Sequence, residues 1–211
     1  MIDMASVRSD LESKGWSRQS GTLEEVRVAA LRDGSLYPTP GRRSSERVLR
    51  PYTSEKAPKH SLSAVYGLGE QPLHSDRAHL RLPPDVVVLH SAVPTPTSTV
   101  VWGPTHRNAF VLPAAAQHGI FTVRNNDESF LASAAHRGKI RFDPVVMSPA
   151  DAFARETVAY IADARPNAHV HLWDAPNLLL FIDNRGALHA RNQVLDPDTR
   201  SVSRALYEWA G

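Results

Sequence analysis

LLLFIDNRGALH, residues 178–189, is an apolar run that ends in a histidine, and we interpret it as a buried strand with a functional side chain at its end. A second run, GEQPLHSDRAH at residues 69–79, places His74 two positions before Asp76. Residues i and i+2 of a strand share a face, so both side chains can point into one cavity. His189 then completes a set of two imidazoles and one carboxylate. Such a set holds Fe(II) and leaves three of its six octahedral positions open.

Two arginines follow His189 in the sequence. Arg200 comes eleven positions later, and Arg204 comes four positions after that. The guanidinium group is a planar fork that matches a carboxylate, so an arginine on a neighbouring strand suits a bound 2-oxo acid. A lone His-x-Asp occurs by chance in many chains. The complete spacing is more specific, and it predicts a mononuclear iron site beside a 2-oxo acid.

Composition places the chain among soluble globular proteins, with 211 residues, 42% hydrophobic and 22% charged. This length predicts one domain over residues 1–211. The absence of cysteine excludes disulfides, thiolate zinc sites and a cysteine nucleophile, and it fits a reducing compartment. The polar start has no signal-like core and no window approaches eighteen apolar residues, so we expect a cytoplasmic protein without a membrane partner.

Net charge also bears on partners. The formal charge is only +2, and basic residues are scattered except in GRRSSER, residues 41–47. No aromatic platform accompanies that cluster, so we expect no nucleic-acid partner. The expected partner is a small-molecule substrate, and a homo-oligomer is left open.

The pattern of elements predicts a mainly β fold with flanking helices. Two helices open the chain within about residues 5–34, and the second begins at Thr22 with Glu25 as a capping box and ends at Gly34. Ser148 and Pro149 predict the start of a later helix that ends before Pro166. Predicted strands cover 47–52, 61–67, 72–76, 85–93, 98–102, 108–112, 119–124, 138–142, 169–173, 177–189 and the region around 200–209. Many short strands without a βαβ rhythm favour an antiparallel double sheet of jelly-roll type.

Several of these runs together carry a family resemblance: SLSAVYGLGEQPLHSDRAHLRLPPDVVVLHSAVP, KIRFDPVVMSP and APNLLLFIDNRGALHARNQVLDPDTRSVSRALYEW. The chain resembles the Fe(II)/2-oxoglutarate-dependent oxygenases of the taurine dioxygenase and clavaminate synthase group over most of its length. The resemblance implies a double-stranded β-helix core with iron held by His74, Asp76 and His189. It also implies 2-oxoglutarate bound to the iron, with its distal C5 carboxylate paired with Arg200.

The resemblance further implies a hydroxyl group on the distal carboxylate. Thr99 is the nearest match, with Thr97 and Ser98 as competitors. The chain departs from the family pattern in two ways: it is shorter between Asp76 and His189, and residues 94–99 lack the usual glycine-rich turn. Both differences affect the lid over the substrate.

Residues for the substrate itself are less specific. Glu70 and Gln71 directly precede the metal segment and either face the substrate or belong to a polar loop. Arg204 falls roughly opposite His189 in a hairpin that turns near Pro197, which predicts that it lies beside the iron. It either shares the 2-oxoglutarate tail or holds an anionic group of the substrate, because two cations on one enclosed face need counter-charges. The alternative is a pair with a protein acid such as Glu208, or a solvent-exposed side chain.

Two further pairs are interpreted as structural. His169 and His171 have no third ligand nearby, and Trp173 indicates a packed strand. Asp183 and Asn184 are expected to fix the strand that leads to His189 through hydrogen bonds.

The expected activity is oxidation of a C–H bond of a small carboxylate-bearing metabolite, such as an amino acid derivative. It is coupled to conversion of 2-oxoglutarate and O2 into succinate and CO2. Desaturation, cyclisation and epimerisation would use the same site. The alternative from another class is a non-catalytic sensor or scaffold that binds metal and 2-oxoglutarate.

Overall fold

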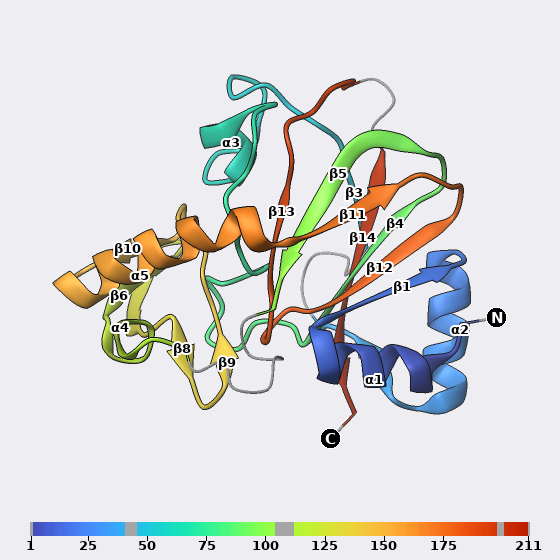
Figure 1. The fold of residues 1–211 in the computed structure, drawn as a ribbon, viewed down its shortest axis with the longest axis horizontal. Helices are drawn as coiled ribbons and strands as arrows, with labels where there is room; N and C mark the ends of the chain where they lie inside the picture. Colours follow the sequence, from blue (N-terminus) through green and yellow to red (C-terminus); the bar gives the residue numbers. More distant parts are fainter. Residues whose placement is uncertain (1, 41–45, 104–111, 198–200, 211) are drawn as a thin grey trace.

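A computed structural model describes residues 2–40, 46–103, 112–197 and 201–210, and within them the chain is mainly β with a few helices (Figure 1). The helices are α1 (Met4–Lys14), α2 (Leu23–Asp33), α3 (Leu62–Tyr66), α4 (Ala114–His118), α5 (Ala152–Ala164) and the 3-10 turn η1 (Arg165–Asn167). The strands are β1 (Trp16–Ser20), β2 (Leu36–Pro38), β3 (Arg47–Leu49), β4 (Val86–Ser91), β5 (Thr95–Trp102), β6 (Phe121–Asn125), β7 (Glu128–Ala132), β8 (Ala135–His136), β9 (Lys139–Ile140), β10 (Met147–Pro149), β11 (His169–Trp173), β12 (Leu178–Asp183), β13 (Leu188–Arg191) and β14 (Val202–Trp209).

The larger sheet has six antiparallel strands in the order β1-β12-β4-β14-β2, with β3 also paired to β14. Its strands β4 and β12 are buried on both faces, and their successive side chains alternate between two hydrophobic clusters. One face packs against α1 and α2, which lie together on that side in Figure 1. The side chains of β4 and β12 on this face are Val86, Val88, Leu179 and Phe181. Burying each such side chain contributes about 1.5–3 kcal/mol, which explains why α1 and α2 stay on the sheet.

The smaller sheet has the order β11-β5-β13 and faces the larger one. The core between them includes Val101 and Trp173 from the smaller sheet and Val87, Leu89, Leu180, Ile182, Val202 and Leu206 from the larger sheet. The opposite face of the smaller sheet, with Val100, Leu188 and Ala190, packs against α5 and the strands beyond it. The space between the two sheets therefore receives side chains from β13 and β14 at once.

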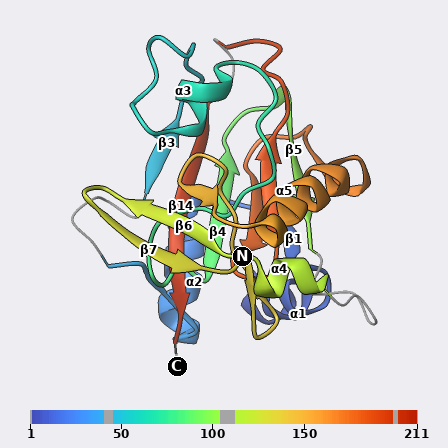
Figure 2. The same ribbon diagram turned by 90° about the vertical axis from the view of Figure 1, so that its left-hand side faces the viewer.

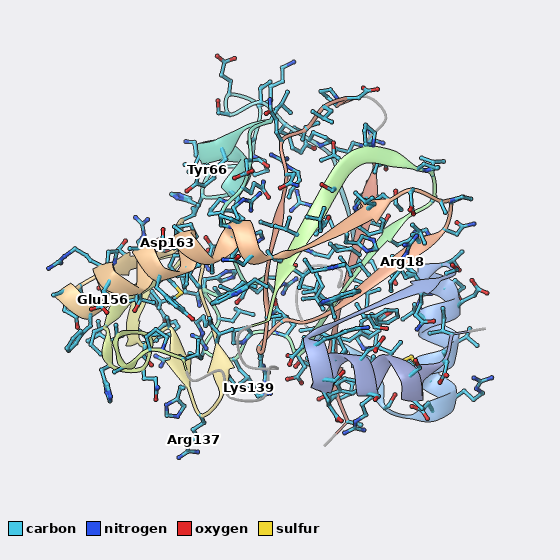
Figure 3. All side chains as sticks on the ribbon, viewed as in Figure 1. Arg18, Tyr66, Arg137, Lys139, Glu156 and Asp163 are labelled. Atoms are coloured by element: carbon cyan, nitrogen blue, oxygen red, sulfur yellow. The ribbon has the colours of Figure 1, made fainter. Side chains whose placement is uncertain are left out.

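A lobe of α4, α5 and the β10-β6-β7 sheet completes the molecule. Figure 2 shows the β6–β7 hairpin in front of the main sheets, with α4 and α5 beside it. In Figure 3 the Glu156 side chain lies on the outer side of this lobe, and Arg137 and Lys139 lie on the neighbouring β8–β9 hairpin; all three are exposed. Among the described residues no helix has both the length and the apolar character needed to cross a membrane.

The helix signals were mostly correct. Thr22 caps α2 and forms the predicted capping box with Glu25, and Gly34 ends the helix in the left-handed region at φ 65°. The predicted start of α5 was wrong by three residues: Ser148 and Pro149 belong to β10, and Asp151 is the N-cap, accepting a hydrogen bond from Ala154 N–H. The end before Pro166 is confirmed.

Three strand predictions need correction. Residues 61–67 form the short helix α3 rather than a strand, and residues 72–76 contain only an isolated bridge at His74. The predicted strand 108–112 lies almost wholly outside the described residues, as do residues 41–45 of the basic cluster.

The third correction concerns the run that ends at His189. It is two strands, because β12 stops at Asp183 and the chain turns before β13 begins. Asp183 Oδ1 accepts hydrogen bonds from the N–H groups of Arg185 (3.1 Å) and Gly186 (2.9 Å), which holds the turn. The turn carries the chain from the six-stranded sheet to the three-stranded sheet, and so moves His189 across the core from the strand that precedes it.

Candidate metal centre

His74 and His189 form an antiparallel bridge in which each backbone N–H donates to the other residue's carbonyl, with both N···O distances 2.9 Å. This bridge attaches the segment around His74 to the edge of β13. The two imidazole rings lie on the same side, with ring centroids 4.5 Å apart. His74 Nδ1 lies 3.0 Å from the carbonyl of Pro72. If Nδ1 donates to that oxygen, Nε2 carries the lone pair that a metal requires.

Asp76 is placed by its backbone. Asn184, which is fully buried, accepts a hydrogen bond from Asp76 N–H (2.7 Å) and donates to Asp76 O (3.0 Å). The same amide donates to the carbonyl of Pro84 (2.9 Å). Ser75 N–H donates to Phe142 O at 2.7 Å. The His-x-Asp segment is thus held in place by the turn before β13 rather than by a strand ladder of its own.

Together these residues bring one ligand atom each from His74, Asp76 and His189 within 4.8 Å of one another, and all three residues are buried. Two polar atoms in this group, Asp76 Oδ2 and His189 Nδ1, are buried without a hydrogen-bond partner in the described part of the chain. A buried carboxylate oxygen without a partner is costly, and a metal ion would supply that partner. The donor set therefore fits Fe(II).

Electrostatics favour the metal-binding forms of Asp76 and His189. Burial raises the pKa of the Asp76 carboxyl, but the charge of Arg204 lowers it, and the pKa lies below its ordinary value. The pKa of His189 is lowered to about 3, first by burial and then by the neighbouring positive groups. An ionised carboxylate and a neutral imidazole are the states that bind metals.

Arg204 lies beside the triad, as predicted, but the predicted hairpin is wrong. In β14 it pairs with Leu89 of β4 and Arg47 of β3, whereas His189 is in the other sheet. Its Nη1 donates to Asp76 Oδ1 at 2.6 Å across the space between the sheets. The alternative, a pair with a protein acid, is confirmed in kind, but the acid is Asp76; the suggested Glu208 pairs with Arg185.

The predicted residues for the distal carboxylate are described only in part, because Arg200 lies outside the described residues. Thr99 is buried on β5, opposite Arg191 of β13, and its Oγ1 accepts a hydrogen bond from Trp173 Nε1 at 3.2 Å. The competing hydroxyls have other partners: Thr97 Oγ1 accepts from Leu195 N–H, and Ser98 Oγ accepts from Asn192 Nδ2.

Glu70 and Gln71 lie in the loop before His74, where Arg165 holds them. Arg165 Nε lies 2.6 Å from Glu70 Oε1, and its Nη1 donates to the Gln71 carbonyl at 2.7 Å. The Glu70 side chain is still 57% exposed, so its carboxylate remains accessible to other groups.

Two charged residues near the site were not identified as candidates from the sequence. Arg191 is two residues after His189 and therefore on its face of β13; it is buried, and its Nη2 donates to the carbonyls of Gly67 and Gly69 at 2.7 Å each. The strand period could have identified it. Asp143 follows Phe142 and lies within electrostatic range of His74; burial raises the pKa of its carboxyl. Only its place after a predicted strand could have pointed to it.

The His169 and His171 pair is structural in character. His169 stacks on Trp16 with centroids 3.8 Å apart, and His171 meets Trp173 edge to face at 4.4 Å. Neither belongs to a group of metal-binding side chains in the described residues.

Comparisons with known proteins were made at the levels of sequence and structure. No protein-family model matches the sequence, and no curated protein matches it. Solved structures do match. An asparagine oxygenase in complex with Fe(II), 3-hydroxyasparagine and succinate has 16% identity and a TM-score of 0.64, covering 97% of this chain and 77% of that one. PvcB, described as an Fe, α-ketoglutarate-dependent oxygenase from an isonitrile synthetic pathway, has 15% identity and a TM-score of 0.66, with 97% and 80% covered.

A third match is a variant of the non-haem iron oxygenase OrfP in complex with (3S)-hydroxy-L-Arg. It has 17% identity and a TM-score of 0.66, covering 98% of this chain and 79% of that one. The chain has the fold of these iron oxygenases. The structural likeness that the sequence indicated is therefore confirmed, and within this oxygenase fold His74, Asp76 and His189 are the group of side chains suited to a metal.

Proposed function

We propose that this protein is an Fe(II)- and 2-oxoglutarate-dependent dioxygenase that hydroxylates a C–H bond of a small amino acid or amino acid derivative and releases succinate and CO2. The observation that carries the proposal is the convergence of His74, Asp76 and His189 within 4.8 Å, with Asp76 Oδ2 buried and lacking a partner in the described chain. In this proposal the two facing sheets are a double-stranded β-helix core, and residues 1–211 form one oxygenase domain with N-terminal helices.

His74, Asp76 and His189 would hold the iron through two imidazole nitrogens and one carboxylate oxygen. Iron bound there supplies O2 activation coupled to decarboxylation of the 2-oxo acid. The protein contributes geometry and a dry environment: Asn184 fixes the backbone of Asp76, and the bridge between the two histidines fixes their separation. A rigid donor set of this kind loses little entropy when the metal binds.

Thr99 and Arg200 would bind the distal carboxylate of 2-oxoglutarate. The Thr99 hydroxyl already accepts a hydrogen bond from Trp173 Nε1, so its own proton is free to be donated to an anion. Arg200, placed by its spacing from His189, would supply the charge.

The substrate would meet groups of both signs. Arg204 uses one N–H for Asp76, and its Nε is buried with no partner among the described residues, so it has donors left for a carboxylate. Asp143 places a carboxyl group within electrostatic range of His74, where its oxygens could accept hydrogen bonds from an ammonium group. Glu70 and Gln71 would line the entrance. The structural neighbours crystallised with hydroxyasparagine and hydroxyarginine make an amino acid the first class to test.

The test is succinate formation by purified protein supplied with Fe(II), 2-oxoglutarate and O2, with and without a panel of amino acids. We expect one class of amino acid to stimulate succinate formation and to gain one oxygen atom. His74→Ala and Asp76→Ala should abolish both effects, whereas Glu156→Ala, on the outer face of α5, should change neither. Tight binding of Fe(II) and 2-oxoglutarate with no succinate formed under any condition would favour the sensor or scaffold instead.

The cytoplasmic location and the homo-oligomer that the sequence suggested remain predictions.

A further inference from the structure

The ion pair between Arg204 and Asp76 connects β14 to the segment that the His74–His189 bridge attaches to β13. Arg204 lies on β14 between Val202 and Leu206, whose side chains pack in the core between the sheets, so the strand period points Arg204 into the same space. Its Nη1 is 2.6 Å from Asp76 Oδ1. The side chains are 19% and 9% exposed, so this charge-assisted hydrogen bond is protected from water.

The pair makes the two oxygens of Asp76 different. Oδ1 accepts the hydrogen bond from Arg204, whereas Oδ2 is buried, has no partner in the described chain and lies 3.9 Å from His189 Nε2. Oδ2 is therefore the oxygen that faces the second histidine. A carboxylate without such a constraint can bind a metal ion with one oxygen or with both.

We propose that Arg204 is a positioning residue that restricts Asp76 to one-oxygen coordination of the metal. The inference rests on the proposed function. The consequence concerns the number of free coordination positions: two histidines and one carboxylate oxygen leave three of six positions, which 2-oxoglutarate and O2 together require. A second carboxylate oxygen on the metal would occupy one of them.

Arg204 could recognise the substrate, or it could orient the metal ligand Asp76, and the two roles predict different effects on the metal. A group that only recognises substrate affects the metal little when it is removed. A group that orients a metal ligand changes the coordination even when no substrate is present. Arg204 can do both, because one of its five N–H donors is used by Asp76.

The experiment uses metal-loaded protein without substrate, with Co(II) alone as the probe. Protein containing ¹³C-labelled aspartate is examined by infrared difference spectroscopy before and after Co(II) is added. The separation between the antisymmetric and symmetric carboxylate stretches is wide for one-oxygen binding and narrow for two-oxygen binding. We expect a wide separation in the wild type, a narrow one in Arg204→Met and a return to the wide one in Arg204→Lys. Arg27→Met, which removes an arginine of α2 that pairs with Glu24 and Glu46, is the matched control and should resemble the wild type.

Co(II) affinity provides the second measurement. Arg204 is a cation near the site, so its removal should not weaken Co(II) binding, whereas a role limited to maintaining the fold would make binding weaker. A wide separation in Arg204→Met, or weaker Co(II) binding with the separation unchanged, would overturn the inference. Arg204→Ala gives the same comparison if the Met variant does not fold. Failure of the wild type itself to bind Co(II), or unchanged binding in Asp76→Ala, would instead overturn the proposed function.

Discussion

His74 and His189 exchange two backbone hydrogen bonds of 2.9 Å each, although they lie far apart in the sequence. This bridge sets the position of the first histidine relative to the second, and Gln71 N–H adds a hydrogen bond of 2.9 Å to the carbonyl of Arg191 on the same strand. The carboxylate of Asp76 is then set by different contacts: Asn184 holds its backbone and Arg204 holds one of its oxygens. The candidate centre is therefore built from three separate connections, and each can be tested by itself.

Asn184→Ala should loosen the backbone at Asp76. The substitution leaves Asp76 N–H, Asp76 O and Pro84 O without the amide that now pairs with them, and each unsatisfied buried group costs about 1–3 kcal/mol. We expect a lower free energy of unfolding in urea and a Co(II) affinity reduced about 10–100-fold. A folded variant that binds Co(II) as tightly as the wild type would show that Asn184 does not position the ligand.

Arg200→Ala should separate the co-substrate from the metal. Removing one partner of a desolvated charge pair costs about 2–5 kcal/mol, so calorimetry on Co(II)-loaded protein should show 2-oxoglutarate binding weakened by that amount. Co(II) affinity should barely change, because Arg200 is not among the three proposed ligands. Arg137→Ala, which removes an exposed arginine from the turn between β8 and β9, serves as the control. Loss of metal with unchanged 2-oxoglutarate affinity would mean that the roles are wrongly assigned.

Arg191→Met should release the loop that precedes the metal segment. The arginine donates to the carbonyls of Gly67 and Gly69, and methionine preserves the apolar stem while removing both hydrogen bonds. We expect faster amide hydrogen exchange at Leu68 to Gln71, measured by mass spectrometry on peptides. Arg141→Met removes a similar bond to the carbonyl of Arg81 in another region and should leave this loop unchanged. Equal exchange in the Arg191 variant and the wild type would contradict the prediction.

His171→Leu should reduce the acid sensitivity of the fold. Burial first, with Arg18 and His169 adding to it and Asp174 opposing it, lowers the pKa of His171 from 6.5 to about 4. Between these values the unfolded chain binds a proton that the folded chain does not, so His171 makes the protein less stable as the pH falls from 6.5 to 4. The full effect is up to about 3 kcal/mol, and it is absent above pH 6.5.

Urea unfolding of the wild type and of His171→Leu at pH 7.5 and pH 4.5 measures this difference. The variant should lose less stability between the two pH values, and a substitution at the exposed His136 should have no such effect. An identical pH dependence in wild type and His171→Leu would show that the histidine is protonated without cost.

Much of the local structure follows from the sequence. The capping box at Thr22 and Glu25 is a contact between residues three positions apart, so its signal is complete within one turn of helix. Strands β4 and β11 were also predicted nearly to their ends, because turn residues bound their apolar patterns. The resemblance to the iron oxygenases could likewise be identified from the residue types and their spacing alone, since the same donor set recurs wherever the same metal chemistry is required.

The break between β12 and β13 did have a local signal, because residues 183–186, DNRG, are turn-forming types. We interpreted the apolar residues on either side of them as one strand. Asp and Gly mark a turn, but they do not show that the chain passes from one sheet to another there. The short helix α3 was mistaken for a strand because five residues are too few to distinguish a period of 3.6 from a period of two.

The sequence by itself supplied the side chains that are proposed for the site: the His-x-Asp pair, the distant histidine and the arginines after it. Only the tertiary structure decided how they are connected. The pairing of Arg204 with Asp76 joins β14 of the larger sheet to the turn that follows the His74–His189 bridge. Because that bridge attaches the turn to β13, the 2.6 Å distance depends on the separation of the two sheets, which the packing of the core between them sets. A local sequence pattern contains no information about the separation of the sheets. That separation results from many apolar side chains that are distant in sequence and meet only in the folded chain.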